Sequence, residues 1–437
     1  MTSGRKLFGT DGVRGEAGTF LTAELATALG RAATASLKAK RPQVLIVRDT
    51  RESGPMLESA LAAGIAAAGG DALLGGVLPT PAAAILVKRL GLDLAAVVSA
   101  SHNPYRDNGI KFFSAQGTKL DDGTEARMES LIEAELAVAE PGQVRELNGG
   151  LEDYLRALEA AFPLDLSGHT VMLDCANGAT FRAAPAIFER LGATVEAIAV
   201  EPDGRNINDG CGSTHLDLLA DRVASSEATI GFAFDGDGDR VLAVDRNGRT
   251  HDGDELIALA ARGMSARDEL DGGVAVTVMS NYGFHQAMEE AGIEVAVTKV
   301  GDRYVLDELR ERGWSFGGEQ SGHIIDTRFA ATGDGTAAAL ATMRELGDRD
   351  LAEVVPMRKL PQTLVNVEVA DRDEIAGATA VWEAVEREGE ALEGRGRVLL
   401  RPSGTEPLVR VMAEAPSAEE AEAVCDRLVA VVRQELG

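Results

Sequence analysis

Short apolar runs alternate with longer amphipathic stretches through most of the chain. The runs at 44–47 and 94–98 have the length and continuous apolar character of buried strands in a parallel sheet. The stretches at 21–37 and 56–68 have the apolar spacing of helices that pack against such a sheet. This alternation predicts an α/β fold, in which helices connect neighbouring parallel strands.

The alternation recurs in three units of similar length and then changes. From about 362 onward, the pattern becomes strand, helix, strand, strand and helix, which is typical of a small α+β module. We therefore expect three similar mixed or parallel α/β domains at 1–142, 150–250 and 253–358, followed by a small α+β domain at 362–437. The three units share no residue-level repeat, so the repetition is one of fold.

The apolar run 94–98 leads into a polar loop, Ser99-Ala100-Ser101-His102-Asn103-Pro104. A serine just beyond the carboxyl end of a buried strand lies where open α/β sheets present their reactive groups. Ser101 is therefore a candidate nucleophile. The alternative is a strand-to-loop turn capped by the side chain of Asn103.

Three aspartates, Asp235, Asp237 and Asp239, alternate with glycines directly after another apolar run. Side chains two positions apart point the same way in extended backbone, and the glycines allow the chain to curl until the carboxylates converge. Convergent carboxylate oxygens favour Mg²⁺. A calcium-binding EF-hand would need glycine and glutamate where Arg240 and Arg246 stand, so that site is excluded. A polar turn is the remaining alternative.

Near the C-terminus, Arg401-Pro402-Ser403-Gly404-Thr405 combines a guanidinium, two hydroxyls and exposed backbone N–H groups around a glycine. Arg410, on the following predicted strand, adds a second guanidinium. Such groups bind a phosphate monoester. Neither a Walker sequence nor a dinucleotide fingerprint occurs in the chain, so ATP and dinucleotides are not expected as ligands.

Two further loops carry polar groups between glycines. Residues 7–15 hold Arg14, which could fork onto a phosphate, although a glycine-rich turn would have the same composition. The loop containing Glu319, Ser321 and His323 offers a carboxylate, a hydroxyl and an imidazole that could hold sugar hydroxyls. Each of these two signals is weak by itself.

The net charge is −27, from 43 basic and 70 acidic residues, which argues against nucleic acid or an anionic membrane as a partner. The three cysteines are far apart and lack Cys-x-x-Cys spacing, so neither a zinc site nor a disulfide framework is expected. No apolar stretch reaches the ~18 residues of a membrane span, and the N-terminus does not read as a signal peptide. We expect a cytoplasmic protein.

Four motifs in order identify a family resemblance. Ser-His-Asn-Pro, Asp-Gly-Asp-Gly-Asp-Arg, Gly-Glu-Gln-Ser-Gly-His and Arg-Pro-Ser-Gly-Thr-Glu-Pro together resemble the α-D-phosphohexomutase family over essentially the whole chain. The stretches 7–15, 202–215 and 300–305, together with Gln320, are most similar to the bacterial members that interconvert glucosamine 6-phosphate and glucosamine 1-phosphate.

The resemblance implies an isomerase whose four domains surround a central cleft. It implies that Ser101 carries a covalent phosphate, that one Mg²⁺ per chain is bound by this serine with the three aspartates, and that a hexosamine bisphosphate is the intermediate. The sugar phosphate is the expected partner, and a homodimer is possible. The resemblance assigns acid–base and charge-stabilising roles to Lys111, His323 and Arg14, and substrate binding to Glu319, Ser321, Arg401, Ser403, Gly404, Thr405 and Arg410.

Three other functions remain open at this point. A phosphomannomutase/phosphoglucomutase would perform the same chemistry on neutral hexose phosphates. A non-catalytic sugar-phosphate-binding protein could keep the cleft, but it would not need Ser101, Lys111 and all three aspartates. A metal-dependent phosphatase would have no need for a separate distal phosphate loop such as 401–405.

Overall fold

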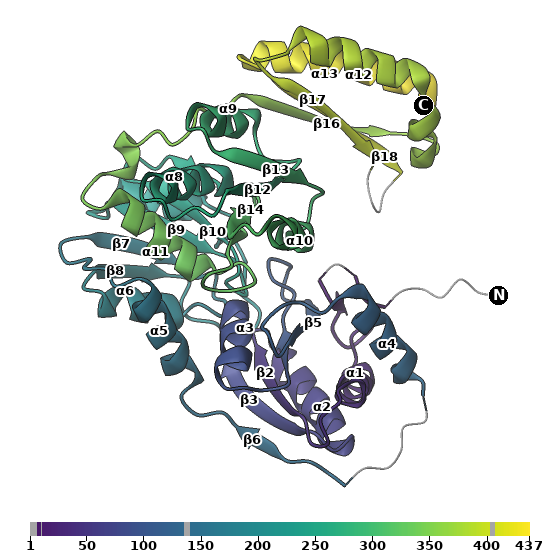
Figure 1. Ribbon diagram of the computed structural model, residues 1–437, viewed down its shortest axis with the longest axis vertical. Helices are drawn as coiled ribbons and strands as arrows, with labels where there is room; N and C mark the ends of the chain where they lie inside the picture. Colours follow the sequence, from purple (N-terminus) through teal and green to yellow (C-terminus); the bar gives the residue numbers. More distant parts are fainter. Residues whose placement is uncertain (1–6, 10, 135–139, 403–406) are drawn as a thin grey trace. The chain divides into compact units, whose positions relative to one another are not determined.

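The computed structural model describes residues 7–9, 11–134, 140–402 and 407–437 (Figure 1). This part of the chain forms two compact units. The first runs to Met279 and includes Ile293–Val355, and the second comprises Ser280–Gly292 and Pro356–Gly437. Within the described residues, the strands form four sheets. The expected α/β fold with a small C-terminal α+β part is confirmed.

The first sheet is mixed, with a parallel centre and an antiparallel edge. In spatial order, its strands are β1 (Val13–Glu16), β5 (Asp107–Ser114), β4 (Leu94–Val98), β2 (Gln43–Arg48), β3 (Asp71–Val77) and β6 (Val144–Glu146). Strands β4, β2, β3 and β6 are parallel, whereas β5 is antiparallel to both β4 and β1. Strand β4 is buried along its whole length, as its continuous apolar run predicts.

Helices cover both faces of this sheet. They are α1 (Ala23–Ser36), α2 (Gly54–Ala67), α3 (Thr80–Arg89) and α4 (Asp122–Ile132). Helices α1, α2 and α4 share one apolar core with the sheet, in which Leu29, Leu61 and Met128 pack against strand residues such as Ile46. Helix α3 packs on β4 and β5 from the other side (Figure 1).

The second sheet has the order β11 (Thr250–His251), β10 (Val241–Asp245), β9 (Ile230–Phe234), β7 (Thr170–Asp174) and β8 (Thr194–Ile198). Strands β8, β7 and β9 are parallel, and β10 turns back along β9 as a hairpin. The helices around it are α5 (Gly150–Ala161), α6 (Ala183–Arg190) and α7 (Asp217–Ala224). The hairpin turn between β9 and β10 consists of the three aspartates and their glycines.

The third sheet has the order β13 (Glu294–Thr298), β12 (Gly273–Thr277), β14 (Phe316–Gly318) and β15 (Ile324–Asp326). Its first three strands are parallel, and β15 is antiparallel to β14. The helices of this part are α8 (Gly253–Ala266), α10 (Asp302–Arg312) and α11 (Gly335–Leu346), followed by the short 3₁₀ helix η1 (Leu351–Glu353).

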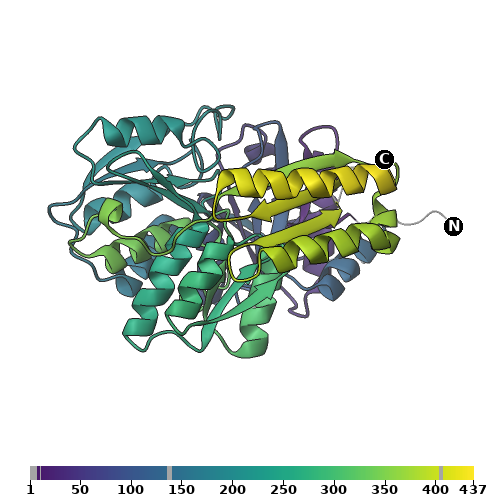
Figure 2. The ribbon, with the colours of Figure 1, turned by 90° about the horizontal axis from the view of Figure 1, so that it is seen from above.

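The second unit contains an antiparallel sheet of β16 (Gln362–Glu368), β18 (Leu408–Glu414) and β17 (Arg397–Pro402). Helices α12 (Thr379–Ala391) and α13 (Ala418–Leu436) cover one face of this sheet (Figure 2). The 3₁₀ helix η2 (Arg372–Gly377) and the helix α9 (Tyr282–Glu290) also belong to this unit. None of the described helices has the length and apolar content needed to span a membrane.

The apolar pattern predicts the parallel strands well but misses several other elements. Strands β1 and β10 and helix α5 have no counterpart among the predicted elements. Helix α4 ends at Ile132, with Glu133 as its cap. Antiparallel strands such as β10 follow turns rather than helical crossovers, so the β-α-β alternation gives no signal for them.

Candidate active site

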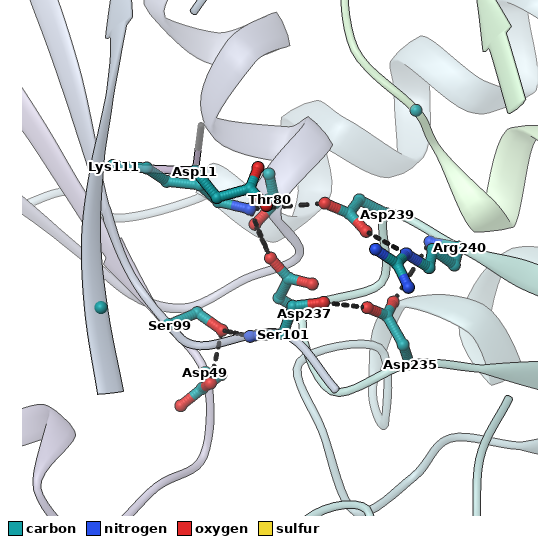
Figure 3. Close-up of polar contacts among 12 residues, drawn as sticks. Asp11, Asp49, Thr80, Ser99, Ser101, Lys111, Asp235, Asp237, Asp239 and Arg240 are labelled. Atoms are coloured by element: carbon teal, nitrogen blue, oxygen red, sulfur yellow. Dashed lines mark hydrogen bonds and ion pairs between the residues drawn. The ribbon is translucent and has the colours of Figure 1, made fainter. Parts of the chain in front are cut away.

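Ser101 lies just beyond the carboxyl end of β4, in a backbone conformation that is unusual for serine. Its φ is +53°, and its residue surface is only 2% exposed. A left-handed conformation costs a non-glycine residue on the order of 1 kcal/mol or more and persists only where the surroundings impose it. The side-chain hydroxyl lies 2.5 Å from Asp235 Oδ2, to which it donates a hydrogen bond (Figure 3).

The three aspartates converge at the turn of the β9–β10 hairpin. Each offers a carboxylate oxygen, and these oxygens all lie within 4.8 Å of one another. The glycine between the first two is required by close packing, because a Cβ at Gly236 would lie 2.5 Å from the backbone oxygen of Ser101. The carboxylates therefore converge, as the glycine spacing predicts, and the hairpin brings them directly onto the serine loop.

The residues present at this turn fit a divalent cation. Burial and the neighbouring Asp239 and Asp237 carboxylates raise the pKa of Asp235 well above its usual range. Asp237 Oδ1 is buried and has no hydrogen-bond partner among the described residues. A buried oxygen without a partner is costly unless a ligand satisfies it, and hard oxygen donors suit Mg²⁺.

Lys111 approaches the aspartates from β5, where it stands opposite Val97 of β4. Its Nζ lies 2.6 Å from Asp237 Oδ2 and 3.4 Å from Asp239 Oδ2. Burial would lower the pKa of Lys111, but the two carboxylates raise it above its ordinary value, so the ammonium is charged. Thr80 donates a second hydrogen bond of 2.6 Å to Asp237 Oδ2. Oδ2 of Asp237 thus accepts two hydrogen bonds from the protein, whereas Oδ1 accepts none from the described residues.

His323 lies between two carboxylates at the other side of the aspartate turn. Its Nδ1 is 3.5 Å from Asp239 Oδ1, and its Nε2 is 3.3 Å from Asp302 Oδ2. Burial disfavours the charged ring, but Asp239 and Asp302 outweigh it and raise the pKa of His323 to about 10. The ring Nε2 also accepts a 3.0 Å hydrogen bond from the backbone N–H of Gly333, which holds the imidazole in a fixed orientation.

A lysine that the sequence did not single out joins two loops of the site. Lys119 Nζ lies 2.6 Å from Asp11 Oδ1 and 2.7 Å from Asp302 Oδ2. Asp11 also pairs with Arg14 at 3.4 Å, and the same Asp302 contacts His323. The sequence offers only one indirect indication of this contact: Asp11 and Asp302, the partners of Lys119, fall within the family-like stretches 7–15 and 300–305.

One cavity of about 570 Å³ brings several predicted residues together. Its wall includes Ser101, Arg14, Asp239, Glu319, Ser321 and His323. Glu319 is held by a 3.0 Å hydrogen bond from the backbone N–H of Gly301 to its Oε1. Residues from four separate stretches of sequence therefore face one space of the size that a sugar phosphate requires.

The C-terminal unit presents a separate pair of arginines. Arg401 on β17 and Arg410 on β18 are directly opposite each other in the antiparallel register, so their side chains lie on the same face of the sheet. Burial, and in addition the neighbouring Arg410, lower the pKa of Arg401. Two guanidiniums on one face of a sheet can attract an anion. Ser403, Gly404 and Thr405 lie outside the described residues.

Solved structures of other proteins share this fold along nearly the whole chain. A phosphoglucomutase/phosphomannomutase family protein from Burkholderia thailandensis matches with a TM-score of 0.83 at 24% identity, covering 98% of this chain and 97% of the other. An N-acetylphosphoglucosamine mutase from Aspergillus fumigatus, in complex with GlcNAc-6P and magnesium, matches with a TM-score of 0.68 at 19% identity, covering 99% and 96%. At these identities, the likeness shows the fold.

Other relatives match at much higher sequence identity. The phosphoglucosamine mutases of Pelotomaculum thermopropionicum and Desulforudis audaxviator are 49% and 50% identical, over 98% of this chain and 99% and 98% of theirs. All four domains of phosphoglucomutase/phosphomannomutase are matched: α/β/α domain I at 5–138, domain II at 152–248, domain III at 252–359 and the C-terminal domain at 364–431. The chain therefore belongs to the phosphoglucomutase/phosphomannomutase family, as the order of its four motifs predicts.

Proposed function

We propose that this chain interconverts glucosamine 6-phosphate and glucosamine 1-phosphate by passing a phosphoryl group through Ser101. The observation that carries the proposal is the hydroxyl of Ser101 hydrogen-bonded to Asp235, in the wall of a cavity that also contains Glu319 and His323. The substrate assignment rests on full-length relatives that are phosphoglucosamine mutases and are 49% and 50% identical to this chain in sequence. The reaction class is that of an isomerase acting by intramolecular phosphotransfer.

In this reaction, the phosphoryl group on Ser101 passes to the free hydroxyl of the sugar monophosphate: the bond between phosphorus and Ser101 Oγ breaks, a bond to the sugar oxygen forms, and the proton of the sugar hydroxyl ends on Ser101 Oγ. The resulting hexosamine bisphosphate turns in the cavity. Ser101 Oγ then bonds to the other phosphorus, the bond between that phosphorus and its sugar oxygen breaks, and the proton of the serine hydroxyl ends on the released sugar oxygen. The sum moves the phosphate of the monophosphate from one sugar position to the other, with phosphorylated Ser101 restored.

Several groups are assigned by their place in this geometry. Asp235, Asp237 and Asp239, with an oxygen at Ser101, would hold one Mg²⁺, which supplies neutralisation of the transferring phosphoryl charge when bound. The A. fumigatus relative contains magnesium, which supports this choice of metal. Lys111 holds the aspartates in place, and His323 and Arg14 face the same cavity as the serine.

The remaining predicted residues bind the sugar phosphate. Glu319 and Ser321, in the cavity wall, are assigned to the sugar hydroxyls. We assign Arg401 and Arg410, with Ser403, Gly404 and Thr405, to the phosphate that does not react. Each predicted domain, 1–142, 150–250, 253–358 and 362–437, thereby supplies one group of residues to the reaction.

A comparison of substrates tests the proposal. Purified protein, primed with glucosamine 1,6-bisphosphate and Mg²⁺, is assayed on glucosamine 6-phosphate, mannose 6-phosphate and glucose 6-phosphate, with the Ser101→Ala variant as the blank. We expect the highest kcat/KM for glucosamine 6-phosphate. A higher kcat/KM on either neutral hexose phosphate would assign the chain to the other activity of its family. Release of inorganic phosphate at the rate of turnover would indicate a phosphatase.

A further inference from the structure

Arg51 is a fully buried arginine that does not belong to the cavity wall formed by the described residues. It follows β2, next to the strand that delivers Ser101. Its guanidinium donates hydrogen bonds to backbone oxygens along the whole serine loop. The acceptors are the carbonyls of Ser101 at 2.9 Å, Asn103 at 2.8 Å, Pro104, and Asp107 at 2.9 Å. One planar guanidinium thus hydrogen-bonds to backbone carbonyls at both ends of the loop.

Asp49 and Ser99 connect the Arg51 guanidinium to the backbone N–H of Ser101. Arg51 Nε lies 2.8 Å from Asp49 Oδ2, and both side chains are buried. The same carboxylate oxygen accepts a 2.6 Å hydrogen bond from Ser99 Oγ, which in turn accepts one of 2.9 Å from the backbone N–H of Ser101 (Figure 3). We call Arg51, Asp49 and Ser99 the Arg51 clasp.

The clasp therefore holds both the N–H and the C=O of the residue whose φ is +53°. Serine does not prefer this conformation, so the loop would relax towards ordinary backbone angles without these contacts. Asn208, from the second sheet's part of the chain, donates to the same carbonyl oxygens of Ser101 and Asn103, at 2.9 and 3.2 Å. The carbonyls of Ser101 and Asn103 thus each accept hydrogen bonds from both Arg51 and Asn208.

We propose that the Arg51 clasp is a positioning device for phosphoryl transfer: it fixes the backbone of Ser101 so that Oγ stays aimed at the aspartate turn in both half-reactions. This inference rests on the proposed function. Arg51 and Asp49 do not touch the cavity, so the effect acts through Ser101 and should appear in kcat rather than in KM. A displacement of about 1 Å at a reacting atom can cost on the order of a hundredfold in rate.

The test compares two serine-to-alanine variants in the same domain. Ser99→Ala removes the hydroxyl between Asp49 and the Ser101 N–H. Ser53→Ala, the matched control, removes a hydroxyl that accepts a 2.8 Å hydrogen bond from Asn108 outside the clasp. We expect similar melting temperatures for the two variants. Only Ser99→Ala should lower kcat, by about tenfold, the equivalent of one lost hydrogen bond, with KM within about twofold of wild type.

The second measurement follows Ser101 itself. Intact mass, sampled over time after addition of glucosamine 1,6-bisphosphate and Mg²⁺, gives the rate at which the protein gains one phosphate. That rate should fall about tenfold in Ser99→Ala and stay unchanged in Ser53→Ala. Equal rates in Ser99→Ala and wild type would overturn the proposal, and so would a rise in KM without a loss of kcat.

Arg51→Lys separates positioning from simple charge pairing. Lysine keeps a cation against Asp49, but its single ammonium cannot fork to carbonyls at both ends of the loop. We expect a stable protein with a tenfold or greater loss of kcat, about the value of a charged hydrogen bond. Full recovery of kcat with lysine would show that Arg51 serves only as a buried ion pair. Failure of the proposed function would instead appear in wild type, as absence of glucosamine phosphate turnover.

Discussion

The carboxylate of Asp237 has two oxygens in very different surroundings. Oδ2 accepts hydrogen bonds from Lys111 and Thr80, both at 2.6 Å, whereas the buried Oδ1 has no hydrogen-bond partner among the described residues. The protein's own hydrogen-bond donors thus contact one oxygen, and the other oxygen is available to a ligand. This division is the physical basis for assigning the aspartate turn to Mg²⁺.

Asp237→Asn should therefore impair the reaction through the metal. The amide removes one negative charge, and its NH₂ group cannot bind a cation or accept from Lys111. We expect kcat/KM to fall by about a hundredfold or more, comparable to the loss of one preorganised electrostatic contact, and the Mg²⁺ requirement to rise. Excess chelator should stop wild-type turnover, and Mg²⁺ should restore it.

The control for this experiment is Asp221→Asn, at an exposed position on α7. It makes the same chemical change far from the turn in sequence and should leave the magnesium titration unchanged. An Asp237→Asn protein that is as active as wild type at every magnesium concentration would remove this carboxylate from the metal site.

At the scale of elements, the start of α10 is joined to the turn after β5 by one lysine. Lys119 is 10% exposed in its side chain and lies between the carboxylates of Asp11 and Asp302. Burial opposes the charge on the lysine, but Asp302 and Asp11 raise its pKa above the ordinary value. Because the two carboxylates face each other, the cation between them holds the two loops together.

Lys119→Met should destabilise the protein by leaving two partly buried carboxylates without their shared cation. Removing one partner of a buried pair costs about 3 kcal/mol or more, which lowers the melting temperature by on the order of 5 °C in a large domain. Thermal unfolding at neutral pH measures this change. Lys88→Met, at an exposed position on α3, is the matched control and should melt close to wild type. Equal melting temperatures for the two variants would contradict a structural role for Lys119.

The pairing of β17 with β18 brings two guanidiniums together, and we expect them to bind the non-reacting phosphate in both orientations of the sugar. Arg410→Ala should then lower kcat/KM in both directions of the reaction. The expected loss is about ten- to a hundredfold, the value of a charge-assisted contact of ~1.5–3 kcal/mol. Phosphorylation of Ser101 should survive, because Arg410 lies in another sheet. Arg433→Ala, exposed on α13, is the control. A loss confined to one direction would show that the two orientations use different anchors.

At the scale of the whole molecule, the sequence predicts what is local and misses what depends on which loops meet. Ser101 and the aspartates could be found because both follow buried apolar strands, and strand ends are where α/β sheets present chemistry. The contact between Lys119 and Asp302 spans 183 positions, and no local pattern encodes it. Arg51 was missed for a different reason: arginine is normally exposed, and only the structure shows that it is fully buried.

Ser101 carries the phosphoryl group in the proposed reaction, and one measurement tests this claim directly. Wild-type protein is phosphorylated with glucosamine 1,6-bisphosphate and Mg²⁺, freed of excess ligand, and mixed with glucosamine 6-phosphate, and its intact mass is followed within a single turnover. We predict that the phosphate is present on Ser101 beforehand, leaves the protein on mixing, and appears in an equal amount of bisphosphate, while Ser101→Ala shows none of these changes. Formation of glucosamine 1-phosphate by a protein that never carries the phosphate would contradict the account.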